Sequence, residues 1–420
     1  MVDAKQIAAS ELDLNEKIGH TEINVEWVLN MLLEHNLPFK QARGESKVKK
    51  VSAKYISEGK GYTSYIYKTT VEFTDRPSYK FVMKIPTDEM INKLFEAMNM
   101  AESLKKDTMD EIKRCHSIEC EAYELLKDIT DYPLAEVYYS EKSNDKAKDI
   151  IVMQDLSESA TTFGIYTSIT TGQCLNFARH LADFQSYVEL KLDESQWRNK
   201  FEKNIHVREK YVKEFRDAMN MLLDYNNGEL KKELEDILSL NWFKFSAYCV
   251  QEKAKEYDGG STLQHGDCWT NNVMIKLSED GSISDEIAAF VDWQCFFEGN
   301  ALFDAARYFV NCADAEIRRE VESQAIDLYY DRLTENLQAH GRKPKLTREQ
   351  AHELYELAYV HQTGVLAQIF TMLVLPDAKS DCKVKQAKAA KIWIRLRFAL
   401  EDQQERLKKY GLLEKFRAVN

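Results

Sequence analysis

The chain has 420 residues, of which 44% are hydrophobic and 30% charged, so it can bury a large core and is not a disordered polymer. Glycine (15) and proline (6) are scarce, which argues against sandwiches, propellers and collagen-like arrays, because their many tight turns need both residues. The formal net charge of −12 disfavours non-specific binding to nucleic-acid phosphates or anionic lipid. We therefore expect a mostly helical protein of two or three structural units that binds neither nucleic acid nor membrane.

The amino-terminal residues and the cysteines favour a cytoplasmic protein. Residues 1–6 lack the apolar stretch behind basic residues that a signal peptide needs. The longest apolar stretch, residues 364–375, contains Gln368 and Thr371 and is too short to span a bilayer, so we expect a buried helix there. The eight cysteines are scattered and include no CxxC pair, which predicts reduced thiols rather than a zinc site or a disulfide framework.

The first part of the chain is expected to mix helices and strands. Behind Thr21, an N-cap candidate, residues 21–36 carry apolar side chains at helical spacing, which predicts an amphipathic helix. Between residues 51 and 85 the apolar period changes to two around an Asp-Arg-Pro-Ser turn signal, which predicts an antiparallel sheet. Residues 88–129 return to helical spacing, and residues 150–153 form a short apolar run typical of a buried strand.

After residue 156 helical spacing continues almost throughout, with one interruption. Short apolar strands at residues 273–277 and 287–291 flank an Asp-Gly turn signal, so we expect a small hairpin within the helical region. Nearer the carboxyl terminus, the sequence Thr-Arg-Glu-Gln from Thr347 fits a capping box and predicts a helix that runs through His361.

The strongest chemical signal surrounds this hairpin. Residues 263–272 read Leu-Gln-His-Gly-Asp-Cys-Trp-Thr-Asn-Asn, and residues 290–293 read Phe-Val-Asp-Trp. Because the strands of a hairpin run antiparallel, Asn272 at the start of the first and Asp292 at the end of the second should lie side by side, with Asp267 nearby. Oxygen ligands of this kind suit Mg²⁺, which prefers one or two carboxylates together with water and substrate phosphates. The pattern therefore predicts a metal site that handles phosphate groups.

These motifs resemble those of the protein-kinase-like small-molecule phosphotransferases, the superfamily of aminoglycoside and choline kinases. Within it, the Trp269 variant of the first motif resembles the ecdysteroid-kinase-like (CHK kinase-like) family. The resemblance implies a bilobal α+β fold. Residues 1–155 would form the N-lobe, with an opening helix, a small antiparallel nucleotide-binding sheet and the hinge, and residues 156–420 a large, mostly helical C-lobe with the catalytic loop and the acceptor site.

The resemblance also assigns roles around the hairpin. It implies that Asp267 is the catalytic residue, which orients or deprotonates the acceptor hydroxyl. It implies that Asn272 and Asp292 bind Mg²⁺ on the nucleotide, which would be ATP. Phosphoryl transfer needs mainly positioning and charge neutralisation, so an ordinary carboxylate suffices as the base.

Further roles fall on the first lobe. The resemblance implies that Lys84, on the third strand of the sheet, holds the α- and β-phosphates of ATP, and that a glutamate on the following helix pairs with it. We favour Glu119 for this partner, with Glu121 as the alternative. The loop that contains Gly59 and Gly61 would cover the phosphates with its backbone N–H groups.

Main-chain and supporting contacts complete the implied site. Residues 151–156 resemble the hinge between the lobes, so the Gln154 carbonyl and the Leu156 N–H would read the adenine. Asp304 resembles the aspartate that braces the catalytic loop, and we interpret His265 as a core histidine that holds the same loop. The chain departs from its relatives at Gln185, where a histidine is common.

The resemblance favours an ATP-dependent kinase that phosphorylates a hydroxyl group of a small molecule, such as a steroid-like, glycosidic or xenobiotic metabolite. A choline- or aminoglycoside-type kinase and a nucleotide-binding pseudokinase scaffold remain alternatives, and so does a metal-dependent hydrolase built on His265 and the nearby aspartates. The motifs H-R-D, D-F-G and A-P-E of protein kinases are absent from the sequence. The acceptor and the oligomeric state stay open.

Overall fold

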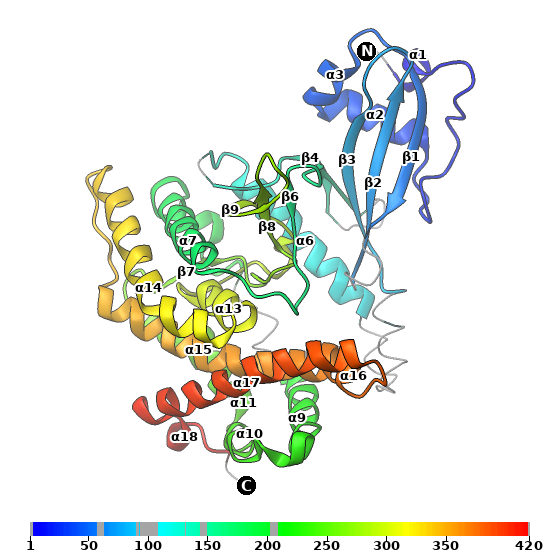
Figure 1. Cartoon of the computed structure of the whole chain (residues 1–420). Helices are drawn as coiled ribbons and strands as arrows, with labels where there is room; N and C mark the ends of the chain where they lie inside the picture. Colours follow the sequence, from blue (N-terminus) through cyan, green and yellow to red (C-terminus); the bar gives the residue numbers. More distant parts are fainter. Residues whose placement is uncertain are drawn as a thin grey trace. The chain divides into compact units, whose positions relative to one another are not determined.

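The structure is a computed structural model that describes residues 3–56, 63–89, 92, 108–130, 132–142, 149–201 and 209–418. The chain divides into two compact units (Figure 1), which are Met1–Lys127 with Leu134–Ser159, and Asp128–Pro133 with Ala160–Asn420. The first unit is built on an antiparallel sheet and the second is mostly helical, so the predicted α+β class is confirmed.

A five-stranded antiparallel sheet with the strand order β1-β2-β3-β5-β4 forms the centre of the first unit. Its strands are β1 Val48–Tyr55, β2 Ser64–Phe73, β3 Tyr79–Pro86, β4 Val137–Glu141 and β5 Ile150–Gln154. The helices described in this unit are α1 Ala4–Ile7, α2 Val25–His35, α3 Leu37–Arg43 and α6 Thr108–Leu126. The strands predicted between residues 51 and 85 and at residues 150–153 are therefore present.

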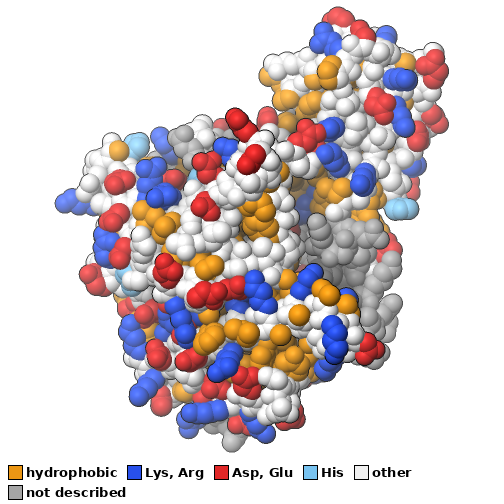
Figure 2. Space-filling model, in the orientation of Figure 1, with side chains coloured by type: hydrophobic (Ala, Val, Ile, Leu, Met, Phe, Trp, Pro, Cys, Tyr) orange, Lys and Arg blue, Asp and Glu red, His pale blue; other side chains and the backbone are white. Residues whose placement is uncertain are grey.

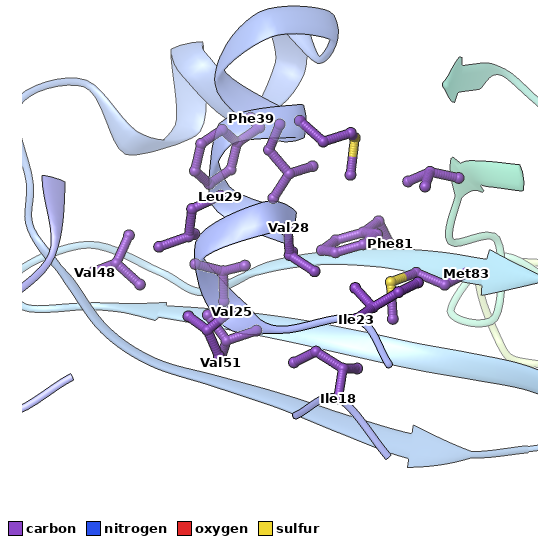
Figure 3. Packing of buried hydrophobic residues seen from close by; sticks show 14 of the residues in the cluster. Ile18, Ile23, Val25, Val28, Leu29, Phe39, Val48, Val51, Phe81 and Met83 are labelled. Atoms are coloured by element: carbon purple, nitrogen blue, oxygen red, sulfur yellow. The ribbon is translucent and has the colours of Figure 1, made fainter. Parts of the chain in front are cut away.

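Side chains of this sheet alternate between its two faces. Strand β2 buries every second residue from Tyr67 to Phe73, as its apolar period of two predicts. The apolar face packs against α2 and α3, where Val28, Leu29 and Phe39 meet the strands (Figure 3). Because alternate residues of a strand point to opposite faces, the β3 residues that do not pack into this core lie on the other face of the sheet.

Helix α2 begins later than predicted. Its N-cap is Asn24, whose side-chain oxygen accepts a hydrogen bond from the Trp27 N–H at 3.0 Å. Thr21 does not cap the helix, because its hydroxyl donates to the Ile18 carbonyl at 2.7 Å and accepts from the Ile23 N–H at 3.1 Å in the preceding turn. Both residue types cap helices well, and the turn selects between them.

Helices make up most of the second unit. They are α7 Thr171–Lys191, α8 Glu194–Trp197, α9 Val212–Asn220, α10 Lys231–Leu238, α11 Trp242–Ala247, α12 Lys253–Lys255, α13 Phe303–Cys312, α14 Ala315–Gln338, α15 Arg348–Ile369, α16 Leu375–Ala378, α17 Lys383–Lys409 and α18 Leu412–Lys415. Short 3₁₀ and π turns occur at η2 Glu209–Tyr211, η3 Tyr225–Gly228, η4 Tyr248–Glu252, η5 Trp293–Cys295 and η6 Phe370–Val374. Every residue of α13 is buried, which makes this helix the centre of the unit.

Two small sheets lie among these helices. One contains β6 Ala160–Thr161, β8 Val273–Leu277 and β9 Ile283–Phe290, and its β8–β9 pair is the predicted hairpin. The other pairs β7 Ser261–Gln264 with β10 Phe297–Asn300 and was not predicted. These strands are buried yet carry polar side chains, including Gln264, Glu298 and Asn300, so they lack the apolar run by which a buried strand is found in a sequence.

The segment Asp128–Pro133 belongs to the second unit, although both of its neighbours in sequence belong to the first. The Tyr132 ring stacks on Phe290, with ring centroids 5.0 Å apart and planes 10° apart. The Phe290 N–H also donates to the Pro133 carbonyl at 2.8 Å. Tyr132 and Pro133 are thus held at the end of β9, at a residue two positions before Asp292.

The predicted capping box at Thr347 is present, and α15 runs to Ile369, beyond the predicted His361. Among the described residues, the continuous helix Arg348–Ala378 is long and apolar enough to cross a membrane by length and composition. However, 78% of its most apolar window is buried inside the unit, which is the pattern of a core helix. The expectation of a buried helix at residues 364–375 is therefore confirmed.

Charged side chains of both signs are interspersed on the face of the molecule shown in Figure 2. The net charge of −12 is therefore not gathered into a single acidic patch on that face.

The capping assignment makes a prediction about stability. Asn24→Ala removes the side-chain acceptor from the first turn of α2, so the free energy of unfolding should fall by about 1 kcal/mol in urea denaturation. Asn24→Ser keeps an acceptor at the same position and should stay close to the wild type. Equal stability of the wild type and Asn24→Ala would contradict the assignment of Asn24 as the cap.

Candidate active site

A buried ion pair lies on the face of the first sheet opposite the apolar core. On β3, Met83 packs into that core, and the next residue, Lys84, lies on the other face. The Lys84 Nζ donates to the Glu119 Oε2 of α6 at 2.6 Å, and the two side chains are 7% and 1% exposed. Glu121 instead pairs at the surface with Lys142 at 3.1 Å. The structure thus selects Glu119 over Glu121 as the partner of Lys84.

The predicted hinge residues follow directly from the end of β5. Gln154 is the last residue of this strand, and its N–H donates to the Glu136 carbonyl at 2.9 Å. Asp155 next forms an ion pair with Lys68 at 2.9 Å, and its side chain is 5% exposed. The chain around Leu156 is therefore fixed by a charged contact, and the adenine-reading role of Gln154 and Leu156 stays a prediction. Gly59 and Gly61 lie outside the described residues.

In the second unit, the loop after β7 is held by one carboxylate. The N–H groups of His265 and Gly266 donate to the two oxygens of Asp304, at 2.7 and 2.9 Å. Asp304 lies in the first turn of α13 and is 2% exposed. This contact is the brace that the resemblance implied.

His265 holds the same loop from within. Its Nδ1 accepts the Asp267 N–H at 3.2 Å, so its Nε2 carries the proton and donates to the Val291 carbonyl at 3.0 Å. His265 as a whole is 1% exposed. His265 thus links the loop to the end of the hairpin, in agreement with its interpretation as a core histidine.

Asp267 and Asn272 are in direct contact. The Asn272 Nδ2 donates to the Asp267 Oδ2 and to the Asp267 main-chain carbonyl, both at 3.0 Å. Both of these bonds use the nitrogen of the Asn272 amide, which leaves its oxygen for a cation. Asp267 is 18% exposed, so its side chain reaches solvent from a mostly buried position.

The hairpin brings its two ends together as predicted. The Val291 N–H donates to the Asn272 carbonyl at 3.0 Å, and Val273 pairs with Phe290. Asp292, the next residue, has φ 66° and ψ 61°, a left-handed conformation that is uncommon for residues other than glycine. Such strain is concentrated at functional sites, which is consistent with a ligand role for Asp292.

Arg307 is a site residue that the sequence analysis missed. Its Nε and one terminal nitrogen both donate to the Asp267 Oδ1, the Nε at 3.0 Å, and its side chain is 8% exposed. It lies one helical turn after Asp304 on α13. A signal was available, because Asp304, Arg307 and Asn311 are spaced i, i+3 and i+7 on an otherwise apolar helix and so form one polar stripe.

The electrostatics of this cluster follow from its burial. Burial raises the pKa of Asp267, the Arg307 guanidinium acts in the opposite direction, and the charge of Asp292 adds to the rise. Burial also raises the pKa of Asp304 to about 7, although its two N–H donors oppose this.

The oxygen ligands present suit a magnesium nucleotide better than an all-protein cage. Among the described residues, no group of three or more His, Cys, Asp or Glu side chains is placed to hold a metal ion. Asn272 and Asp292 supply one amide oxygen and one carboxylate, and Mg²⁺ commonly takes its remaining ligands from water and phosphates. The residues therefore fit the ion that the resemblance implied.

Comparison with known proteins gives a family match over most of the chain. The model of family DUF1679, described as "Uncharacterized oxidoreductase dhs-27", matches residues 25–405. The chain is 24% identical over 350 residues to the Caenorhabditis elegans protein "Uncharacterized oxidoreductase dhs-27". That alignment covers 81% of this chain and 42% of the relative, so the chain spans about two-fifths of the length of the relative.

Solved structures are more distant. A choline kinase from Cryptosporidium parvum Iowa II has 12% identity and a TM-score of 0.45, and the match covers 87% of this chain and 90% of that one. The GDP complex of wild-type aminoglycoside 2'-phosphotransferase-IIIa has 12% identity and a TM-score of 0.42, with 90% and 99% covered. These likenesses are too distant to assign a role to any residue.

The turn at Gly266 predicts a large effect of one added methyl group. Gly266 has φ +85°, and a Cβ there would lie 2.1 Å from the Cys295 carbonyl oxygen. Gly281 is a matched control, because its φ is +80° and a Cβ there would meet nothing within 4 Å. In urea denaturation Gly281→Ala should cost about 1–2 kcal/mol and Gly266→Ala about 2–5 kcal/mol. Equal losses would show that the loop is not confined by Cys295.

The raised pKa of Asp304 predicts a pH dependence of stability. Since its folded pKa of about 7 exceeds its ordinary 3.8, the folded protein binds more protons between these values. The contribution of Asp304 to the free energy of unfolding is therefore fully present below about pH 4. It is lost as the pH rises to about 7, by up to about 1.4 kcal/mol per pH unit. Asp304→Asn lacks this titration, so the stability of the wild type relative to the variant should decrease from pH 5 to pH 7 in urea unfolding. A constant or increasing difference would refute the assigned pKa.

Proposed function

This chain belongs to the ecdysteroid-kinase-like family DUF1679, and we propose that it is an ATP-dependent phosphotransferase that transfers the γ-phosphate of ATP to a hydroxyl group of a small molecule. One observation carries the proposal. A partly exposed carboxylate, Asp267, is fixed within a braced loop and bonded to Asn272, whose oxygen remains for a cation, beside the strained Asp292.

The residues of the second unit would then orient the acceptor. Asp267 would accept a hydrogen bond from the acceptor hydroxyl and take its proton late in the transfer. Asp304 and His265 would keep the Asp267 main chain in place through the three N–H contacts of the loop. Asn272 and Asp292 would hold Mg²⁺, which when bound neutralises phosphate charge and orients the transferred group.

The residues of the first unit would bind the nucleotide. Lys84 is buried, ion-paired and extended from a rigid strand, which are the features needed to present an ammonium group to α- and β-phosphates. Glu119 would fix the direction of Lys84. The predicted main-chain contacts of Gln154 and Leu156 with adenine complete the proposed nucleotide contacts.

The name of the curated relative describes an oxidoreductase, of which this chain covers 42%. A nicotinamide-dependent oxidoreductase of the common kind needs a parallel sheet with a glycine-rich turn before a helix. In the described part of this chain, every strand pair within the three sheets is antiparallel. The described residues therefore favour phosphate transfer over hydride transfer.

A hydrolase and a pseudokinase fit the site less well. A metal-dependent hydrolase would use His265 and Asp304 as ligands, but both are occupied in loop contacts. A pseudokinase scaffold would be expected to have lost part of the set Lys84, Asp267, Asn272 and Asp292, and the chain retains all four.

We propose the acceptor as a chemical class of alcohol. The family resemblance favours steroid-like, glycosidic or xenobiotic alcohols, and a cationic alcohol such as choline remains the alternative. A search by mass spectrometry for metabolites that gain a phosphate in the presence of the protein and Mg-ATP would identify the acceptor.

Asp267→Asn tests the catalytic assignment. Because Asp267 is assigned to the acceptor and not to the nucleotide, phosphate transfer should fall by about 10²–10⁴-fold. The increase in melting temperature caused by Mg-ATP should stay the same in the wild type and the variant, since ligand binding stabilises the folded state of both.

Two results would count against the proposal. Unchanged transfer by Asp267→Asn would remove Asp267 from the mechanism. The absence of any stabilisation of the wild type by Mg-ATP would contradict a nucleotide-binding function altogether.

A further inference from the structure

The hydrogen bonds of Asp267 are distributed unevenly over its two oxygens. A carboxylate has about four acceptor sites, two on each oxygen. Arg307 fills both sites of the Oδ1 with its Nε and a terminal nitrogen. Asn272 fills one site of the Oδ2 at 3.0 Å. One acceptor site is therefore left among these contacts, and it lies on the Oδ2.

Arg307 is itself held in place. Its other terminal nitrogen donates to the Gln362 Oε1 of α15 at 3.2 Å, and the same oxygen accepts from Asn311 Nδ2 at 3.2 Å. Gln362 is fully buried, and Arg307 comes from a helix that is buried along its whole length. The guanidinium is thus fixed by two core helices, whereas a surface arginine would have to lose its rotamer freedom when the substrate binds.

We propose that Arg307 is a positioning residue, which occupies the Oδ1 of Asp267 and so makes the Oδ2 the oxygen that receives the acceptor hydroxyl. This inference rests on the proposed phosphotransferase function. Helix α13 would then hold Asp267 through two residues that are one helical turn apart. Asp304 holds the main chain of the loop that contains Asp267, and Arg307 holds the Asp267 side chain.

The transfer step balances with these groups. The acceptor O–H donates to the Oδ2 of Asp267 while the acceptor oxygen forms a bond to the γ-phosphorus. The bond from the γ-phosphorus to the bridging oxygen breaks, and its electron pair leaves with ADP. The hydroxyl proton ends on the Oδ2 and then passes to solvent, so Arg307 neither gains nor loses a proton.

Kinetics with Mg-ATP, with water as the acceptor, test this role through the release of ADP. Arg307→Met removes the charge and the donors at similar length, so kcat should fall by about 10²-fold, the size expected for a misplaced catalytic group, while the KM for Mg-ATP stays unchanged. Arg307→Lys keeps one donor and should recover part of the loss. In an Asp267→Ala background, Arg307→Met should cause no further loss, because Arg307 acts only through Asp267.

A matched control separates the loss of a positioning contact from the general destabilisation that follows when any buried arginine is removed. Arg318 is fully buried on α14 and pairs with Asp402 of α17 at 2.7 Å. Arg318→Met should lower the melting temperature without changing kcat. An additive loss in the Asp267→Ala background, or an equal loss of kcat in Arg318→Met, would overturn the role assigned to Arg307.

Crystal structures of Arg307→Met and Arg307→Lys provide a readout that does not depend on turnover. The Asp267 carboxylate should leave its present orientation in Arg307→Met and keep it in Arg307→Lys, while the bond from Asn272 to the Asp267 carbonyl persists in both. An unmoved carboxylate in Arg307→Met would refute the positioning role. If the wild type neither binds nor hydrolyses Mg-ATP, the proposed function fails, and the crystal structures still decide whether Arg307 positions Asp267.

Discussion

The candidate catalytic loop depends on one buried carboxylate that receives two main-chain N–H groups. His265 and Gly266 donate to the two oxygens of Asp304, and an unpaired buried N–H would cost about 1–3 kcal/mol. Asp267 is the next residue in the chain, so its direction follows from these bonds. Because Asp304 belongs to a helix with no exposed residue, the loop gains the rigidity of the core, which precise chemistry requires.

The chain has a net negative charge, yet the nucleotide that it is proposed to bind is a polyanion. The distribution of charge around the candidate site therefore has to explain what attracts the phosphates. The cluster of the second unit has three carboxylates, Asp267, Asp292 and Asp304, and one guanidinium, Arg307. In the first unit the charge of Lys84 is balanced by Glu119. Under the proposed function, the carboxylates described in these two clusters offset the charges of Arg307 and Lys84, so a bound cation and main-chain N–H groups would supply much of the attraction for phosphate.

Features encoded in short, ordered motifs were predictable from the sequence. The hairpin that brings Asn272 beside Asp292 follows from local spacing and turn chemistry. The roles of the lysine on the third strand and of the brace at Asp304 follow from the resemblance of their motifs to those of a known superfamily. Features that depend on tertiary partners were not. The choice of Asn24 over Thr21 as a cap is of this kind, and so are the polar strands β7 and β10. Arg307 combines both cases. Its place on a polar stripe of the helix could be inferred from the sequence, but its partner Asp267 could not, because that contact depends on the tertiary structure.

The segment Asp128–Pro133 has a consequence for how the chain can be divided. It lies inside the sequence of the first unit but stacks Tyr132 on Phe290 in the second, so the backbone passes between the units at three points. No single cut yields two complete halves. A fragment that starts at Ala160 would lose the ring packed two residues before Asp292, and a chimaera that exchanges the first unit must keep these six native residues within the foreign sequence.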